Sequence, residues 1–317
     1  MSRPAASRSL ADGGDGSLVR LAAFLLMSLV WGLTWMPMKL ASEAVPPILL
    51  AAVRFIVAGL CFGLYAAVTR LPLRPSRPGR VLLASLLITT GCYGPLFWGL
   101  ARAPTGISAL VNFALMPVFI IGIGSLYGLE PITRRRLASV ALGAAGLALL
   151  FSTRSGAAGE GLAVTAGLAG VVVGTASYAW GAVLSRPLVQ DGSPVALAFW
   201  QTLLGGVALL PVSALVEGAD FSGLAGFAEP KALFGLAFLV GAGTLVGFSI
   251  YLWLVREWGA FRAGLYSFVS PAVAVGVGIW WGGEAFGWPE AVGTALMMAA
   301  TATVITEPRR NANVSAS

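Results

Sequence analysis

The sequence segment that decides the fold lies at residues 104–130 and reads PTGISALVNFALMPVFIIGIGSLYGLE. A second segment, at 260–284, reads AFRAGLYSFVSPAVAVGVGIWWGGE. Each is apolar and long enough to cross a bilayer, which takes about 20 helical residues. A shift of 154 residues aligns a proline, two glycines and an acid, namely Pro117 with Pro271, Gly122 with Gly276, Gly124 with Gly278 and Glu130 with Glu284. The match indicates an internal duplication.

The beginning of the chain repeats as well. A shift of 147 residues aligns Pro47 with Pro194, and it places Gln201 opposite Arg54. The change of shift falls in the segment 217–230, where an insertion is easily tolerated. Because each half holds five predicted spans, an odd number, the second half is expected to be inverted relative to the first.

The composition places the whole chain in a membrane. Of its 317 residues 57% are hydrophobic and only 10% are charged, and the mean hydropathy is +0.86, which excludes an ordinary soluble enzyme. The fold class predicted is an all-α membrane protein with ten transmembrane helices in two inverted five-helix repeats. The spans are expected near 18–40, 46–68, 80–101, 104–126, 134–152, 161–184, 194–216, 231–255, 259–282 and 287–306.

Four regions follow from these spans. Residues 1–17 are predicted to be a disordered cytoplasmic tail, 18–155 the first five-helix repeat, 156–306 the second, and 307–317 a second cytoplasmic tail. The glycine pairs Gly170/Gly174 and Gly243/Gly247 have the spacing of close helix packing in membranes.

The distribution of basic residues predicts the orientation. With the N-terminus inside, 15 of the 20 lysines and arginines fall on the cytoplasmic side. An N-in, C-in protein is therefore expected. The net charge of +7 is thereby explained as a topology signal, and no nucleic-acid partner is expected.

The sequence lacks the residues that several kinds of chemistry require. The chain has no histidine, and its two cysteines lie in apolar segments, so no metal site, no cofactor and no enzymatic activity are expected. Neither lysine follows the glycine of a phosphate-binding loop, which excludes direct use of ATP.

Three short stretches carry a family resemblance. The chain resembles the EamA-type drug/metabolite transporters at Trp31-Gly32 through Lys39, at Pro46-Pro47 and at Ala52-Val53-Arg54-Phe55. The segments 104–130 and 260–284 resemble the closing helices of each half in the same family. The resemblance covers roughly residues 20–306 and implies a ten-helix exporter of small metabolites with a central cavity that works by alternating access. It also implies a location in the cytoplasmic (inner) membrane. Some members export amino acids, including aromatic ones, so an amino acid is the expected substrate; a monomer or weak dimer is expected.

Arg54 is the charged residue that most needs an explanation. It lies about eight residues into its span, where a charge costs on the order of 3 kcal/mol. No acid lies deep in any predicted span. Two interpretations stay open: a structural arginine that binds freed backbone carbonyls, or one that attracts a substrate or controls a gate.

Polar side chains deep in the predicted spans are the candidates for lining the cavity. Rings with a polar atom lie well inside spans at Tyr93, Tyr178, Trp180 and Tyr266, although such rings also serve as interfacial belts or ordinary packing. Neutral polar groups at mid-membrane that could bind a substrate, or could equally hydrogen-bond between helices, are Asn112, Ser177, Gln201 and Ser267.

The prolines are predicted to break two helices. Asn112 and Tyr266 align in the duplication, each five residues before Pro117 or Pro271. Proline frees a backbone carbonyl, so Pro117 and Pro271 are predicted to act as hinges or gates beside a substrate site near the middle of the membrane.

Competing functions differ in the residues they need. A proton-coupled antiporter or importer of the same fold would need a buried acid or histidine; Glu130 and Glu284 are candidates, but residues at span ends more often form caps or salt bridges. A membrane enzyme would need acids or histidines gathered at one interface, and a channel would need rings of charge. The expectation is facilitated export.

Overall fold

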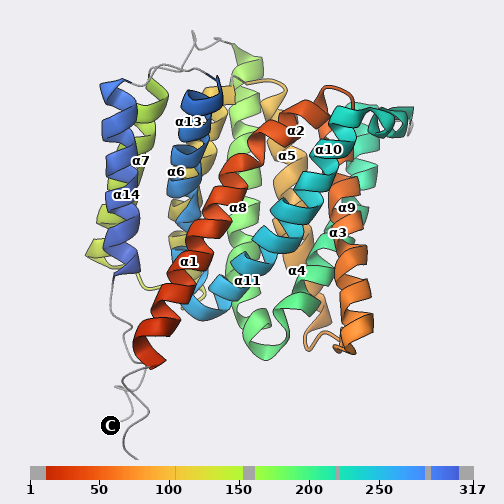
Figure 1. The fold of residues 1–317 in the computed structure, drawn as a ribbon, viewed down its shortest axis with the longest axis horizontal. Coiled ribbons are helices and arrows are strands. Elements are labelled where there is room, and N and C mark those ends of the chain that lie inside the picture. The colour runs from red at the N-terminus through yellow and green to blue at the C-terminus, as the bar shows by residue number, and fades with distance from the viewer. Residues whose placement is uncertain (1–11, 104, 153–160, 219–221, 283–286, 307–317) are drawn as a thin grey trace, which may run out of the picture.

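The computed structural model describes residues 12–103, 105–152, 161–218, 222–282 and 287–306, and every regular element within these ranges is a helix (Figure 1). The α-helices are α1 (Asp12–Leu33), α2 (Trp35–Ser42), α3 (Pro47–Thr69), α4 (Pro78–Ser85), α5 (Gly91–Leu100), α6 (Thr105–Leu126), α7 (Arg134–Ser152), α8 (Leu162–Asp191), α9 (Pro194–Glu217), α10 (Pro230–Phe238), α11 (Gly247–Trp258), α12 (Ala260–Gly264), α13 (Tyr266–Gly282) and α14 (Trp288–Ile305).

Three further segments are wound differently. The π-helix η1 (Leu86–Thr90) joins α4 to α5, and the π-helix η3 (Leu239–Val246) joins α10 to α11. A short 3₁₀-helix, η2 (Ser222–Ala228), precedes α10. Each π-helix continues the helices on either side, so that α4, η1 and α5 form one rod, as do α10, η3 and α11.

The helices bear out a multi-pass membrane protein. Among the described residues, eight helical segments are long and apolar enough to cross a membrane. They correspond to the first eight predicted spans, and the ninth and tenth predicted spans hold α12, α13 and α14. The count of ten spans and their inversion remain predictions.

Two predicted boundaries are wrong. Helix α1 begins at Asp12, inside the segment predicted as a disordered tail, and α8 continues to Asp191, past the predicted end at residue 184. The predictions followed the apolar residues, but backbone hydrogen bonds let a helix extend beyond its apolar part. Residues 1–11, the tail 307–317 and Glu284 lie outside the described residues.

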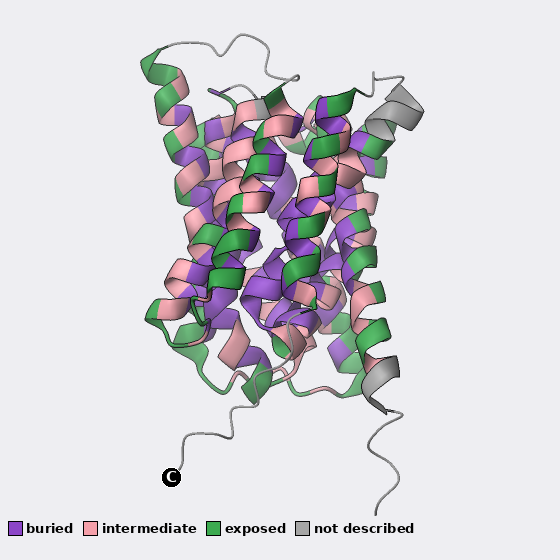
Figure 2. Cartoon of the chain, turned by 90° about the vertical axis from the view of Figure 1, so that its left-hand side faces the viewer, coloured by how far each residue is buried: buried purple, intermediate pink, exposed green. Residues whose placement is uncertain are grey.

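Helices of the first half pack against helices of the second half. Helix α3 packs on α9 and α7 packs on α14, and in each pair the helices occupy the same position in their halves. Likewise α6 packs on α8 as α13 packs on α1. Two related halves are expected to give this pattern. Figure 2 shows buried residues facing the interior of the bundle and exposed ones facing outward.

Glycine allows the tightest crossings. A Cβ atom at Gly206 of α9 would lie 2.8 Å from the backbone nitrogen of Ile56, and one at Gly59 of α3 would lie 2.9 Å from that of Leu203. In α8, Cβ atoms at Gly170 and Gly174 would lie 2.8 and 2.7 Å from backbone oxygens of α5. The glycine spacing thus marks close packing, which supplies van der Waals contact where lipid gives no hydrophobic drive.

The two prolines do not break their helices. Helices α6 and α13 run through Pro117 and Pro271 without interruption. The prediction of breaks there is wrong, because neighbouring groups in a bundle can satisfy the carbonyl that a proline frees. The irregular segments are instead η1 and η3, which correspond when the chain is shifted by 154 residues, and a turn at Leu265 between α12 and α13.

Candidate functional site

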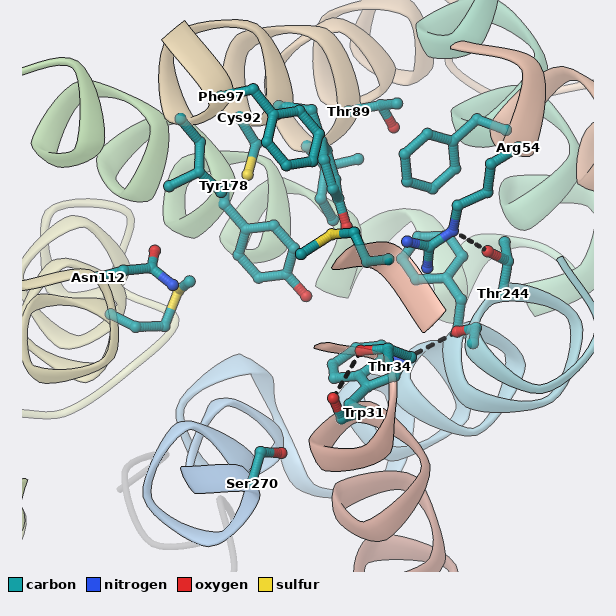
Figure 3. A pocket seen from close by; sticks show the side chains of 18 of the residues that line it. Trp31, Thr34, Arg54, Thr89, Cys92, Phe97, Asn112, Tyr178, Thr244 and Ser270 are labelled. Atoms are coloured by element: carbon teal, nitrogen blue, oxygen red, sulfur yellow. Dashed lines mark hydrogen bonds between the residues drawn. The ribbon is translucent and has the colours of Figure 1, made fainter. Parts of the chain in front are cut away.

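A cavity lies between the helices of both predicted halves. About 1000 Å³ of space free of protein atoms lies in and around it, a volume that includes the part open to solvent. The elements around it are α1, α2, α3, η1, α5, α6, α8, η3, α11 and α13. Most of its wall is apolar or aromatic, and a few polar groups converge on it (Figure 3).

Arg54 of α3 contributes the positive charge of this cavity. Its side chain is buried, with 8% of the residue exposed, and its Nε donates a hydrogen bond to Thr244 Oγ1 at 2.9 Å. The guanidinium lies 4.9 Å from the centre of the Phe55 ring, and the Tyr93 hydroxyl is close enough to interact with it. No salt bridge joins Arg54 to an acid among the described residues.

The π-helix η3 makes room for this arginine. Thr244 Oγ1 donates to the carbonyl of Leu239, five residues back, and accepts from Arg54. A Cβ atom at Gly243 would lie 3.2 Å from Arg54 Nη2, so glycine leaves space for the guanidinium. The carbonyl of Gly243 also accepts a hydrogen bond from Trp31 Nε1 at 2.9 Å. A π-helical segment often marks a functional site because it rearranges backbone groups.

The corresponding π-helix, η1, is held by hydroxyl groups. Thr89 and Thr90 donate to carbonyls of α9, at Gln201 and Gly205, and Ser177 of α8 donates to the carbonyl of Leu87 at 2.9 Å. Ser177 therefore serves a helix contact and is not among the residues that line the cavity.

Aromatic rings form one wall. Trp31 and Tyr266 meet edge to face with centroids 4.4 Å apart, and Tyr251 lies 5.4 Å from Trp31 and 6.0 Å from Tyr178. Tyr178 is 7% exposed, and its hydroxyl makes no hydrogen bond of good geometry among the described residues, although the side chains of Tyr251 and Tyr266 are close enough to interact with it. In Figure 3 the Tyr178 ring and the Arg54 guanidinium extend toward the middle of the cavity from different sides.

Asn112 of α6 lies across the cavity from Arg54 (Figure 3). Its Oδ1 is 2.7 Å from the hydroxyl of Thr175 on α8, which also lies 2.7 Å from the carbonyl of Val171. This contact fixes the Asn112 amide at the wall.

The structure brings together only part of the predicted site. Of the candidate substrate-binding residues, those that line the cavity are Arg54, Tyr93, Asn112, Tyr178 and Tyr266. Gln201 is fully buried and donates to Ser185 at 2.7 Å, and Ser267 is fully buried outside the cavity. Pro117 and Pro271 do not line the cavity either.

The structure places Trp180 away from the cavity. It is 41% exposed, and its Nε1 donates to the Tyr127 hydroxyl at 3.0 Å. Residues two apart on a helix point in different directions, so α8 cannot present both Tyr178 and Trp180 to the interior.

The site predicted from the sequence lacks several lining residues, above all Trp31, Thr34 and Thr244. One signal was present: Thr244 corresponds to Thr90 when the chain is shifted by 154 residues, so a hydroxyl recurs at matching positions of the two halves.

A second polar cluster lies beyond the end of α6. Glu130 Oε2 accepts from Arg136 at 2.7 Å, and Oε1 accepts from Arg186 at 3.4 Å and from the backbone nitrogen of Phe261 at 3.3 Å. Arg186 also donates to the carbonyl of Leu129. The salt bridge expected of Glu130 is confirmed.

Known proteins resemble the chain over most of its length. It is 26% identical to the uncharacterized inner membrane transporter YedA of Escherichia coli (strain K12), with 83% of this chain and 82% of that protein covered. It is also 26% identical to a probable amino-acid metabolite efflux pump of Salmonella typhimurium (strain LT2), with 87% and 91% covered. A crystal structure with 21% identity superposes with a TM-score of 0.73, covering 89% of this chain and 96% of that one, and so shares the fold.

The family match covers both halves. The model of the EamA-like transporter family matches residues 19–152 and again 165–306. The resemblance seen in the short motifs is thereby confirmed: the chain belongs to the EamA-like transporter family.

Proposed function

We propose that this protein is a secondary transporter, not an enzyme, that exports small amphipathic metabolites by alternating access. Amino acids are the first class to test, since one relative is named as a probable amino-acid metabolite efflux pump. The observation that carries the proposal is the cavity itself, an apolar chamber with few polar groups, lined by helices from both predicted halves. A site between two repeats is the arrangement expected for alternating access.

The protein would work in the cytoplasmic membrane, as a monomer or weak dimer, with both termini inside. The excess of basic residues on the predicted inner side supports this orientation. The name of the inner membrane relative supports the location.

Transport is proposed to be facilitated. No acidic residue is among the described residues that line the cavity, and the chain has no histidine, so a group that could carry a proton beside the substrate is missing there. The second candidate is a proton-coupled antiporter or importer, and the observation that favours it is the buried carboxylate of Glu130. Its contacts with Arg136 and Arg186 give it a structural role instead.

The test uses the full chain purified into liposomes. Vesicles loaded with an unlabelled amino acid are diluted into a trace of the labelled one, and a panel of amino acids is compared. We expect uptake by counterflow that persists with a protonophore and changes little between mildly acidic and neutral pH. The variant Arg54→Gln should lose most of the flux, while Arg135→Gln, an exposed arginine outside the cavity, should keep it.

Two results would count against the proposal. Flux that needs an imposed proton gradient would favour the proton-coupled alternative and direct attention to Glu130. The panel could also show no protein-dependent flux for any amino acid, with Arg54→Gln indistinguishable from the wild type. That result would refute the transport of amino acids through the cavity.

A further inference from the structure

The described residues that line the cavity include a positive charge but no negative charge to balance it. Of its described lining residues only Arg54 is charged at neutral pH, and none is an aspartate or glutamate. The other polar side chains in the wall are neutral, and the remainder of the lining is apolar, aromatic or glycine. The empty cavity therefore holds one buried positive charge.

The partners of Arg54 among the described residues are neutral. Its Nε donates to the Thr244 hydroxyl, the Phe55 ring lies against the guanidinium, and the Tyr93 hydroxyl is close enough to interact with it. Neutral dipoles lower the cost of a buried charge without cancelling it, whereas a carboxylate both cancels the charge and accepts hydrogen bonds from a guanidinium in two parallel contacts.

A second donor faces the same space. The Tyr178 hydroxyl is buried, and Tyr178 lines the cavity. The side chains of Tyr251 and Tyr266 are close enough to interact with this hydroxyl, but no hydrogen bond of good geometry holds it among the described residues, so it can still donate to a ligand or a water. Tyr178 and Arg54 approach the middle of the cavity from different sides, so one ligand can contact both (Figure 3).

We infer that the cavity selects singly charged anions, namely small carboxylates with an apolar or aromatic body and no ammonium group. A monoanion brings the total charge of the occupied cavity to zero. An amino acid is a zwitterion, so its carboxylate can bind Arg54, but its ammonium group then meets a wall without a described carboxylate. An uncompensated charge in a low-dielectric site is unfavourable. The inference rests on the proposed function: it keeps the export of small amphipathic metabolites and makes carboxylates, in place of amino acids, the preferred substrate class.

Three matched compounds test the inference. Phenylpropionate, phenylalanine and phenylethylamine share the ring and the two-carbon chain, and they differ only in carrying a carboxylate, both charged groups, or an ammonium. Binding to the full chain in detergent is measured by isothermal titration calorimetry at neutral pH. We expect phenylpropionate to bind about tenfold or more tightly than phenylalanine, and phenylethylamine not to bind.

Variants separate charge from shape. Arg54→Gln should remove the preference for the anion, and Arg54→Lys should keep the order of affinities with weaker binding, because a lysine retains the charge but not the planar pair of donors. Arg135→Gln, which removes an exposed charge outside the cavity, should bind as the wild type does. If Arg54→Gln does not fold, the affinities of the three compounds for the wild type and for Arg54→Lys still test whether the cavity prefers the anion.

The outcomes separate the inference from the proposed function. If phenylalanine binds as tightly as phenylpropionate, or more tightly, the inference is overturned while amino-acid export stands. If the anion preference survives in folded Arg54→Gln, Arg54 is not its source and the inference is likewise overturned. If none of the three binds, the inference also fails, and the proposed function fails with it only if vesicles show no amino-acid flux.

Discussion

Glu130, in the segment between α6 and α7, lies 3.4 Å from Arg186 of α8 and so joins the two predicted halves through an ion pair. The carboxylate is 2% exposed, and Arg136 binds its other oxygen at 2.7 Å. Asn112 and Met116 of α6 line the cavity, whereas Glu130 follows the C-terminal end of that helix. The ion pair thus holds the halves together away from the cavity.

The first prediction concerns this pair. Glu130→Gln should lower the stability of the folded protein by about 3 kcal/mol or more, because it leaves the buried Arg136 and the partly buried Arg186 without their carboxylate. Thermal unfolding in detergent measures the change. The matched control is Glu43→Gln, whose 3.8 Å pair with Lys231 is exposed and should contribute about 0–1 kcal/mol. Equal effects of the two variants would contradict the structural importance of Glu130.

The second prediction concerns the acceptor of Arg54. Thr244→Val removes the hydroxyl that binds Arg54 Nε and the carbonyl of Leu239, so it should cost about 1–3 kcal/mol and reduce flux. Thr244→Ser keeps the hydroxyl and should restore most of both. Thermal unfolding and counterflow on the same preparations provide the two readouts. Wild-type behaviour of Thr244→Val would show that Arg54 does not depend on this contact.

The third prediction contrasts two residues of α8. Tyr178→Phe removes a buried hydroxyl that makes no hydrogen bond of good geometry among the described residues, so stability should change by less than about 1 kcal/mol while the KM for transport increases. Trp180→Phe loses an exposed hydrogen bond to Tyr127 and should leave the KM unchanged. Counterflow at several substrate concentrations measures both. The assignment of Tyr178 to the cavity would be wrong if Trp180→Phe had the larger effect on KM.

The fourth prediction concerns topology. In a background with Cys61→Ala and Cys92→Ala, the exposed positions Ser76 and Ala225 are each changed to cysteine. A membrane-impermeant maleimide applied to intact cells should label Ala225→Cys, and Ser76→Cys should react only after the cells are opened. Labelling of both from one side would refute the N-in arrangement of these loops.

The class of fold can be predicted from the amino-acid sequence alone. Apolar length predicts helices because a bilayer offers no water to unpaired backbone groups, so each crossing segment must satisfy its own hydrogen bonds. The glycine spacing in α8 likewise predicted close helix contacts, because a helix face without side chains lets the backbone of a neighbouring helix approach closely. Arg54 was also recognisable from the sequence, because a charge inside an apolar membrane segment is costly whichever direction its side chain points.

Which side chains meet cannot be predicted from the sequence, because it depends on how the helices pack. The direction of a side chain depends on how its helix is rotated against its neighbours, and α6 through α9 are hydrophobic on nearly every face, so periodicity does not show their orientation. Tyr178 therefore points into the cavity while Trp180 points outward, and Gln201 binds Ser185 instead of Arg54. Thr244 reaches Arg54 across 190 positions of sequence because η3 packs against α3, a contact that no local pattern encodes.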